Sequence, residues 1–117
     1  MIVNSGKNLV RNWLAGDSVN PADYMAIGTG STSPQPSDTA LQNEVLRKDA
    51  SESKGGTGEV TYTITVGSSE ANGNDLQEVG LFNASSGGTM LNRITFTKIS
   101  KTSDIEVKFE IKITVTT

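Results

Sequence analysis

Ile105-Glu-Val-Lys-Phe-Glu-Ile-Lys-Ile-Thr-Val115 is the stretch of this sequence that decides the fold. Apolar residues occupy every odd position in it, and charged or polar residues occupy every even one. This period of two predicts a β-strand with one buried and one exposed face. At about 3.3 Å per residue, the predicted strand is about 35 Å long. Its exposed positions alternate acid and base from Glu106 to Lys112, which discourages pairing of a free edge with random partners.

Further strands are predicted upstream of this stretch. Residues 60–66 alternate Val, Tyr and Ile with Thr in the same way. Shorter apolar runs predict strands at 24–28, 76–82 and 90–99, and Asn72-Gly73 is a strong turn signal. The fold class we expect is therefore mainly β, an antiparallel β-sandwich formed by a single domain over 1–117.

One short N-terminal helix is predicted over residues 5–15. Ser5 is the expected N-cap, and Gly16 is the expected stop. The apolar residues at helical spacing are Leu9, Val10, Trp13 and Leu14.

Two polar loops, at 31–38 and 49–58, are predicted to be mobile. The first is rich in Ser and Pro, and the second is rich in Ser and Gly. We expect deletion of 50–58 to leave the fold intact and to weaken assembly with neighbouring molecules.

Composition excludes several kinds of chemistry. The 117 residues include no His and no Cys, which removes imidazole catalysis, thiol nucleophiles and the usual zinc sites. The net charge of −3 argues against nucleic acid or an anionic membrane as partner. No apolar run is long enough to span a bilayer, and the N-terminus lacks the apolar core of a signal peptide. Five residues that could supply oxygen ligands to a metal stand beside turn residues, so we expect them to close turns and not to bind metal: Asp17, Asp23, Asp38, Asn74 and Asp75. No cofactor is expected.

Four charged residues lie among apolar neighbours: Glu44, Arg47, Glu78 and Arg93. Charges within core strands are costly unless they are paired. We therefore predict a partly buried ion network, with Glu44 paired to Arg47 and Glu78 paired to Arg93. One alternative is that these charges make contacts with a neighbouring copy or a partner. The other is that Glu44 and Glu78 are the two carboxylates of a glycosidase. Such enzymes usually line their substrate cleft with aromatic residues, and this chain has only six aromatic residues in all. We therefore expect no catalytic residue here.

Trp13 is either a core residue of the predicted helix or an anchor for a partner, with the core favoured. The two polar loops supply the other candidate partner contacts, Ser33 and Gln35 in the first and Lys54 in the second.

Several segments together resemble the N-terminal domain of phage tail-collar and tail-fibre proteins, and short virion proteins of tailed phages. The resemblance covers most of the chain, from about residue 8 onward. The segments that carry it are Tyr24–Gly30, Thr39–Arg47, Glu70–Asp75, Leu76–Phe82, Gly88–Arg93 and Lys98–Lys101.

The resemblance implies a non-enzymatic structural role in a virus particle, made in the host cytoplasm and located in the virion. In the fibre proteins this domain joins the fibre to the baseplate, and a shaft and a receptor-binding tip follow. No shaft or tip follows here, so we expect a tail, baseplate or fibre-attachment component that contacts other virion proteins. A homotrimer is expected by analogy only. A capsid decoration protein is the alternative, and a carbohydrate-binding module or small glycosidase is a more remote one.

Overall fold

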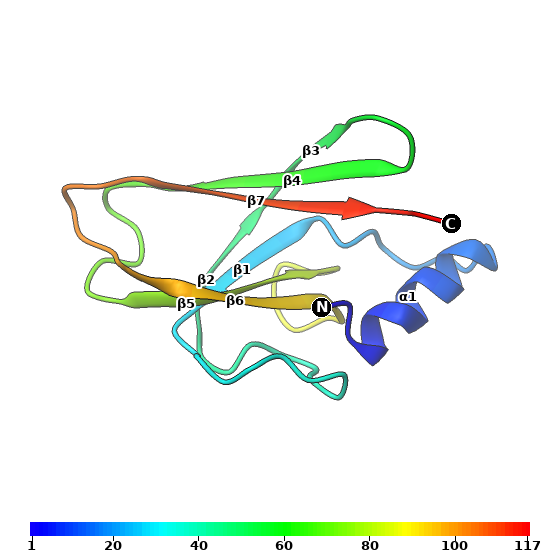
Figure 1. The fold of residues 1–117 in the computed structure, drawn as a ribbon, viewed down its shortest axis with the longest axis horizontal. Coiled ribbons are helices and arrows are strands. Elements are labelled where there is room, and N and C mark those ends of the chain that lie inside the picture. Colours follow the sequence, from blue (N-terminus) through cyan, green and yellow to red (C-terminus); the bar gives the residue numbers. More distant parts are fainter.

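The computed structural model describes all residues 1–117 and contains two antiparallel sheets and one helix (Figure 1). The predicted antiparallel β-sandwich with an N-terminal helix is confirmed. In chain order the elements are α1 (Asn4–Leu14), β1 (Tyr24–Gly28), β2 (Glu44–Asp49), β3 (Ser51–Lys54), β4 (Glu59–Val66), β5 (Asp75–Phe82), β6 (Met90–Ser100) and β7 (Val107–Thr114).

The two sheets are connected along one side of the sandwich and are not connected along the other. Sheet A has the order β2-β1-β5-β6, and sheet B has the order β3-β4-β7. β2 and β3 follow each other across Ala50, whose N–H donates to the Asp23 carbonyl at 2.8 Å, so one extended segment joins the two sheets. On the opposite side β6 and β7 are not paired with each other. The rings of Phe96 and Phe109 bridge the sheets there, with centroids 5.4 Å apart.

The central strands of sheet A, β1 and β5, are buried on both faces. Because side chains alternate along a strand, Met25 and Ile27 of β1 enter the main core between the sheets, while Ala26 between them enters a second core on the outer face. The loop 29–43 runs below that outer face in Figure 1 and contributes Leu41 to the second core. The other members of the second core are Val3, Phe82 and Met90.

Helix α1 lies at one end of the sandwich and begins one residue earlier than predicted. Ser5 does not cap it, because the N-cap is Val3 and the Ser5 hydroxyl donates instead to the Met90 carbonyl at 2.8 Å. A Cβ on Gly6 would overlap the Leu91 carbonyl, so glycine is needed where the helix crosses β6. Neither the length nor the composition of α1 suits a membrane-spanning helix, and the structure has no other helix.

The segment 49–58 is more ordered than predicted. Most of it is β3 and its turn, and Ser51 to Lys54 pair with Thr63 to Val60 of β4. The sequence pattern did not predict this strand, because all four of its side chains are exposed and it therefore shows no alternation of apolar and polar residues. Because deletion of 50–58 removes a strand of sheet B, the structure argues against the expectation that this deletion spares the fold.

The loop 31–38, which the sequence predicted to be mobile, is held by hydrogen bonds at several points. The Pro36 carbonyl accepts the Asn4 N–H at 2.8 Å, which ties the loop to the start of α1. The carboxylate of Asp38 accepts the Gln35 N–H and also binds Arg93. These contacts join the loop to the helix and to β6.

The last strand is shorter than the alternation predicted. β7 covers Val107–Thr114, because the chain turns at Thr102 to Ile105 before the strand begins. Ile105 and Val115 flank it and are exposed.

Candidate functional site

The most unusual polar residue of the structure is Glu78, which is completely buried on the outer face of β5. Its carboxylate accepts four hydrogen bonds. Oε1 accepts the Gln42 N–H at 2.8 Å and the Arg93 Nε–H at 2.9 Å. Oε2 accepts the N–H groups of Gly30 and Asn43, each at 2.8 Å. The carboxylate thus holds both ends of the loop 29–43 against sheet A.

Arg93 is the second charged member of this site. Its Nη1 donates to Asp38 Oδ2 at 3.2 Å, so the guanidinium joins two carboxylates from different parts of the chain. We call Glu78, Arg93 and Asp38, with the three N–H groups that bind Glu78, the Glu78 cluster. Arg93 Nη2 is buried without a hydrogen-bond partner.

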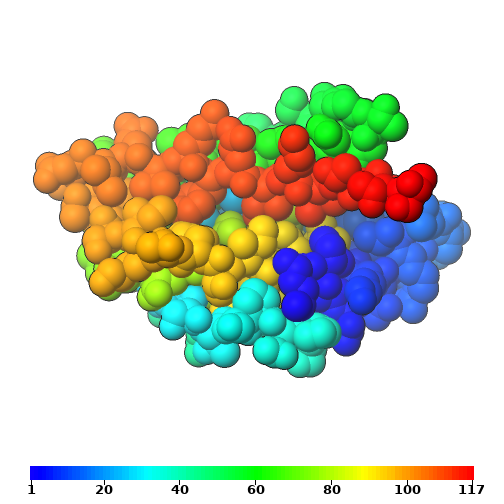
Figure 2. Space-filling model, viewed as in Figure 1, coloured from blue at the N-terminus to red at the C-terminus, as the bar shows by residue number.

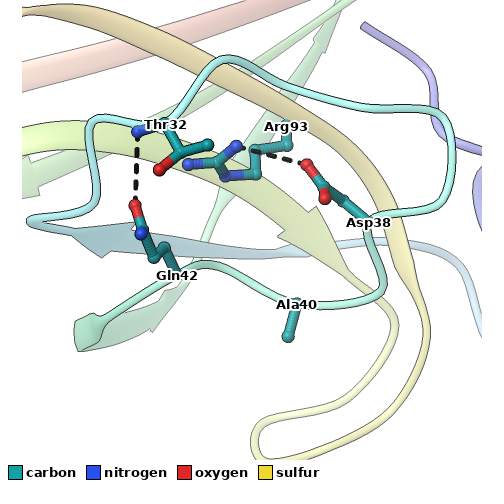
Figure 3. A pocket seen from close by; sticks show the side chains of 5 residues that line it. All are labelled: Thr32, Asp38, Ala40, Gln42 and Arg93. Carbon is teal, nitrogen blue, oxygen red and sulfur yellow. Dashed lines mark hydrogen bonds and ion pairs between the residues drawn. The ribbon is translucent and has the colours of Figure 1, made fainter.

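A small cavity of about 250 Å³ adjoins this cluster (Figure 3). The Arg93 guanidinium forms one wall, and a hydrogen bond from the Thr32 N–H to Gln42 Oε1 crosses one side. The lining residues are Thr32, Asp38, Ala40, Gln42 and Arg93. Because two carboxylates already neutralise the single guanidinium, the cluster offers no excess positive charge to an anionic ligand.

The environment of Glu78 favours its ionised form. Burial by itself raises the pKa of this carboxyl, but the hydrogen bonds from Asn43, Gln42, Arg93 and Gly30 outweigh it, so the pKa lies below the ordinary value. Glu78 is therefore a permanent negative charge at neutral pH. Proton transfer to or from a substrate would first have to break the hydrogen bonds that occupy both oxygens.

The two predicted ion pairs are both present, but they form two separate clusters and not one network. Glu78 pairs with Arg93, as described, and Glu44 pairs with Arg47 in a two-pronged contact of 2.7 and 2.9 Å. Arg47 also donates to the carbonyls of Ala84 and Gly87. Its guanidinium lies 3.8 Å from the centre of the Phe82 ring, a cation–π contact. This second cluster ties β2 to the turn after β5.

Glu44 and Glu78 do not form a facing pair of carboxylates. Both lie opposite Gly28, on the two strands that flank β1. Each is bound to its own arginine, and only Glu44 is exposed at the surface. The arrangement is that of two structural anchors.

The candidate partner contacts do not gather at one place. Trp13 is half-buried, packs on the main core and donates its indole N–H to the Val19 carbonyl at 3.2 Å, which agrees with the core interpretation. Ser33 and Gln35 are exposed on the loop below sheet A, whereas Lys54 is exposed on β3 of the other sheet (Figure 1). These positions do not define one common surface.

The sequence reasoning missed two buried polar residues, Lys101 and Asn92. The Lys101 ammonium donates to Asn72 Oδ1 at 2.7 Å and to the Thr102 carbonyl at 2.9 Å. Asn92 Oδ1 accepts the Leu81 N–H at 3.0 Å, beside the irregular pairing of β5 and β6. The only signal was that both residues lie in segments that carry the family resemblance, Asn92 in Gly88–Arg93 and Lys101 at the end of Lys98–Lys101.

Comparison with known proteins found no relative of this chain. No protein-family model matches the chain, and no curated protein matches it.

Proposed function

We propose that the protein is a structural component of a tailed virus particle, located in the tail, the baseplate or the fibre attachment. The proposal begins from the resemblance to the tail-collar and tail-fibre N-terminal domain. What supports it in the structure is the place that the resembling segments take in the fold.

Four of these segments, which are scattered along the sequence, meet at the Glu78 cluster. Tyr24–Gly30 supplies the Gly30 N–H, and Thr39–Arg47 supplies the N–H groups of Gln42 and Asn43. Leu76–Phe82 supplies the carboxylate, and Gly88–Arg93 supplies the guanidinium. This convergence is the observation that carries the proposal, because it makes the resembling residues the internal framework of one folded unit.

The two remaining segments meet at a second place. Asn72, in Glu70–Asp75, accepts a hydrogen bond from Lys101, the last residue of Lys98–Lys101. The backbone joins the same segments, since the Gly73 N–H donates to the Lys101 carbonyl and the Lys101 N–H donates to the Asn74 carbonyl. All of the resembling segments therefore build contacts that hold the domain together.

A structural role also agrees with the chemistry of the charged residues. The carboxylates that a glycosidase would use are bound to arginines, and Glu78 is sealed from solvent. These groups stabilise strand pairing and the loop 29–43. The domain would act by presenting its surfaces to other copies and to other virion proteins.

The test is the copy number of this chain in purified particles of the virus that encodes it. Quantitative mass spectrometry with labelled reference peptides compares the chain with the major coat protein. A host ribosomal protein serves as the control for contamination. A small, constant number of copies per particle is the expected result.

The other outcomes overturn the proposal in whole or in part. A copy number close to that of the coat protein would identify a capsid decoration protein and contradict the tail location. Absence from particles, or a level equal to that of the ribosomal control, would overturn the virion role itself.

A further inference from the structure

One edge of β7 has no partner strand. β7 pairs with β4 along its whole length and with no other strand. The Val115 N–H donates to the Gly58 carbonyl at 2.8 Å, and bonded residues recur at every second position of an antiparallel ladder. The odd-numbered residues therefore turn their backbone groups toward β4. Lys108, Glu110 and Lys112 turn theirs toward the free edge.

The charges on this edge have only one charged neighbour on β4, namely Glu59, which lies diagonally across from Lys112. Lys108, Glu110 and Lys112 are each more than half exposed. Their closest ion pairs are Lys108 with Glu110 on the same strand, at 3.1 Å, and Lys112 with Glu59, at 3.5 Å. The residues directly opposite them on β4 are Thr65, Thr63 and Thr61. The acid–base alternation of β7 is therefore matched on β4 only at Lys112, and no residue directly opposite is charged.

We propose that β7 pairs in an antiparallel manner with β7 of a second copy of this chain, with Phe109 of both copies at the two-fold axis. In this register Lys108 of each copy lies opposite Glu110 of the other. Glu106 of each copy likewise lies opposite Lys112 of the other. Opposite charges across an antiparallel pair are stabilising.

The neighbouring registers are unfavourable. A two-fold axis at Lys108 or at Glu110 preserves the backbone hydrogen bonding. However, it places Lys108 opposite Lys108 of the second copy, or Glu110 opposite Glu110 of the second copy. Like charges directly across a pair of strands are destabilising. Registers that set an odd residue opposite an even one lose the hydrogen bonding, because only even residues face the free edge. The charge pattern thus selects the axis at Phe109 over its immediate neighbours.

The pairing also covers an apolar surface. A groove of about 480 Å³ lies between β6 and β7, and most of its lining is apolar. Figure 2 shows β7, in red, uncovered along the near face of the molecule, with β6 in yellow and orange below it. In the proposed dimer Phe109 meets Phe109 of the second copy, and Val107 meets Ile111 of the second copy. These side chains project from the inner face of sheet B, so the grooves of the two copies adjoin at the axis.

Such a contact uses the same surface on both copies and closes at two. The proposed dimer is therefore an alternative to the homotrimer expected by analogy.

The test measures the dimerisation of the full chain by analytical ultracentrifugation over a wide range of concentration. A monomer–dimer equilibrium is expected. Lys108→Glu sets two glutamates opposite each other at each of the symmetric contacts, and it should raise the Kd at least about tenfold. Glu110→Lys should do the same with two lysines. Lys54→Glu makes the same charge change on β3, the other edge of sheet B, and should leave the Kd unchanged.

A mixture of the two variants tests whether residue 108 of one copy lies opposite residue 110 of the other. Lys108→Glu on one copy and Glu110→Lys on the other restore opposite charges at both symmetric contacts, so the mixture should form a heterodimer with nearly the original affinity. Thermal unfolding of each variant verifies that it is folded. In the unsubstituted dimer, the amides of Lys108, Glu110 and Lys112 should become protected from hydrogen exchange as the concentration rises.

Three results would overturn the proposal. They are a chain that stays monomeric at every concentration, a trimer, and a dimer whose Kd does not change with Lys108→Glu.

Discussion

At the scale of single residues, Glu78 has the widest influence on this fold. Its carboxylate binds β6 through Arg93 and binds the loop 29–43 through three backbone N–H groups. Because that loop supplies Leu41 to the second core, the cluster also keeps the outer face of sheet A covered. Gly28 and Gly30 belong to the same arrangement, since a Cβ on either would come within 2.6 Å of Glu78 Oε2.

Replacement of Glu78 by glutamine should destabilise the protein strongly. Glu78→Gln removes the buried one of the two carboxylates that neutralise Arg93, and it turns an amide N–H₂ toward other N–H donors. Breaking a buried ion pair on one side typically costs about 3–5 kcal/mol. The measurement is the free energy of unfolding in urea at pH 7.

Glu44→Gln is the matched control for this substitution. It makes the same change opposite the same residue of β1, but at a partly exposed pair whose arginine keeps its two carbonyl partners. Its cost should be no more than about 1 kcal/mol. Equal losses in the two variants would contradict the role assigned to the Glu78 cluster.

At the scale of secondary-structure elements, the extended segment of β2 and β3 is the main departure from what we predicted. Alternation along 44–49 is interrupted by Glu44 and Arg47, whose charges are satisfied by each other and by carbonyls of the turn after β5. β3 has no buried side chain at all. Both strands form because neighbouring strands offer them backbone partners, which no local pattern reveals.

Deletion of 50–58 should lower stability. The deletion joins Asp49 directly to Glu59. Ser51, two residues after Asp49, pairs with Thr63, and Thr63 already lies about 13 Å from Glu59 along β4 at 3.3 Å per residue. Closing that gap requires the start of β4 to leave its pairing with β7. A clear fall in the thermal midpoint is expected by circular dichroism.

The control for the deletion replaces only Gly56–Gly58 by Asn-Gly, which suits a tight hairpin and leaves both strands in place. This variant should keep a midpoint close to that of the unaltered chain. If the deletion variant also kept its midpoint, β3 would have no role in the stability of sheet B.

At the scale of the whole molecule, stability depends on carboxylates that are ionised in the folded state. The hydrogen bond from Lys48 and the Gly67 N–H lower the pKa of Glu70. For Glu78, the four hydrogen bonds overcome the effect of burial and also lower the pKa. Each group binds its proton less tightly when folded, so its contribution to stability is complete above its ordinary pKa near 4.5. That contribution is lost as the pH falls through the folded pKa.

The urea midpoint should therefore change little from pH 7 to about pH 5 and should fall steeply below about pH 4.5. Glu78→Gln cannot lose this contribution, so its midpoint should fall less over the acidic range. The difference between the two proteins should narrow from pH 7 to pH 3. Parallel curves for the two proteins would show that Glu78 does not carry the acid sensitivity.

The sequence alone was sufficient for the features that depend on neighbouring residues. A buried face on β4 and on β7 requires alternation, and a charge within a core strand requires an opposite charge. For this reason the mainly β class, the short helix and the pairs Glu44–Arg47 and Glu78–Arg93 were all predictable. The ends of β7 and the N-cap were less so, because turns and contacts with other strands set them.

The tertiary structure was needed for every feature that depends on distant residues meeting. Strand order, the passage from β2 to β3 between the sheets and the second core under the loop 29–43 are of this kind. So are the backbone N–H groups that bind Glu78, since any residue type except proline can supply an N–H and composition does not mark them. Likewise, alternation shows that β7 has a charged face, but only its hydrogen bonding with β4 shows which residues face the free edge. Side-chain periodicity is a local property of the chain, whereas backbone pairing is a property of two segments at once.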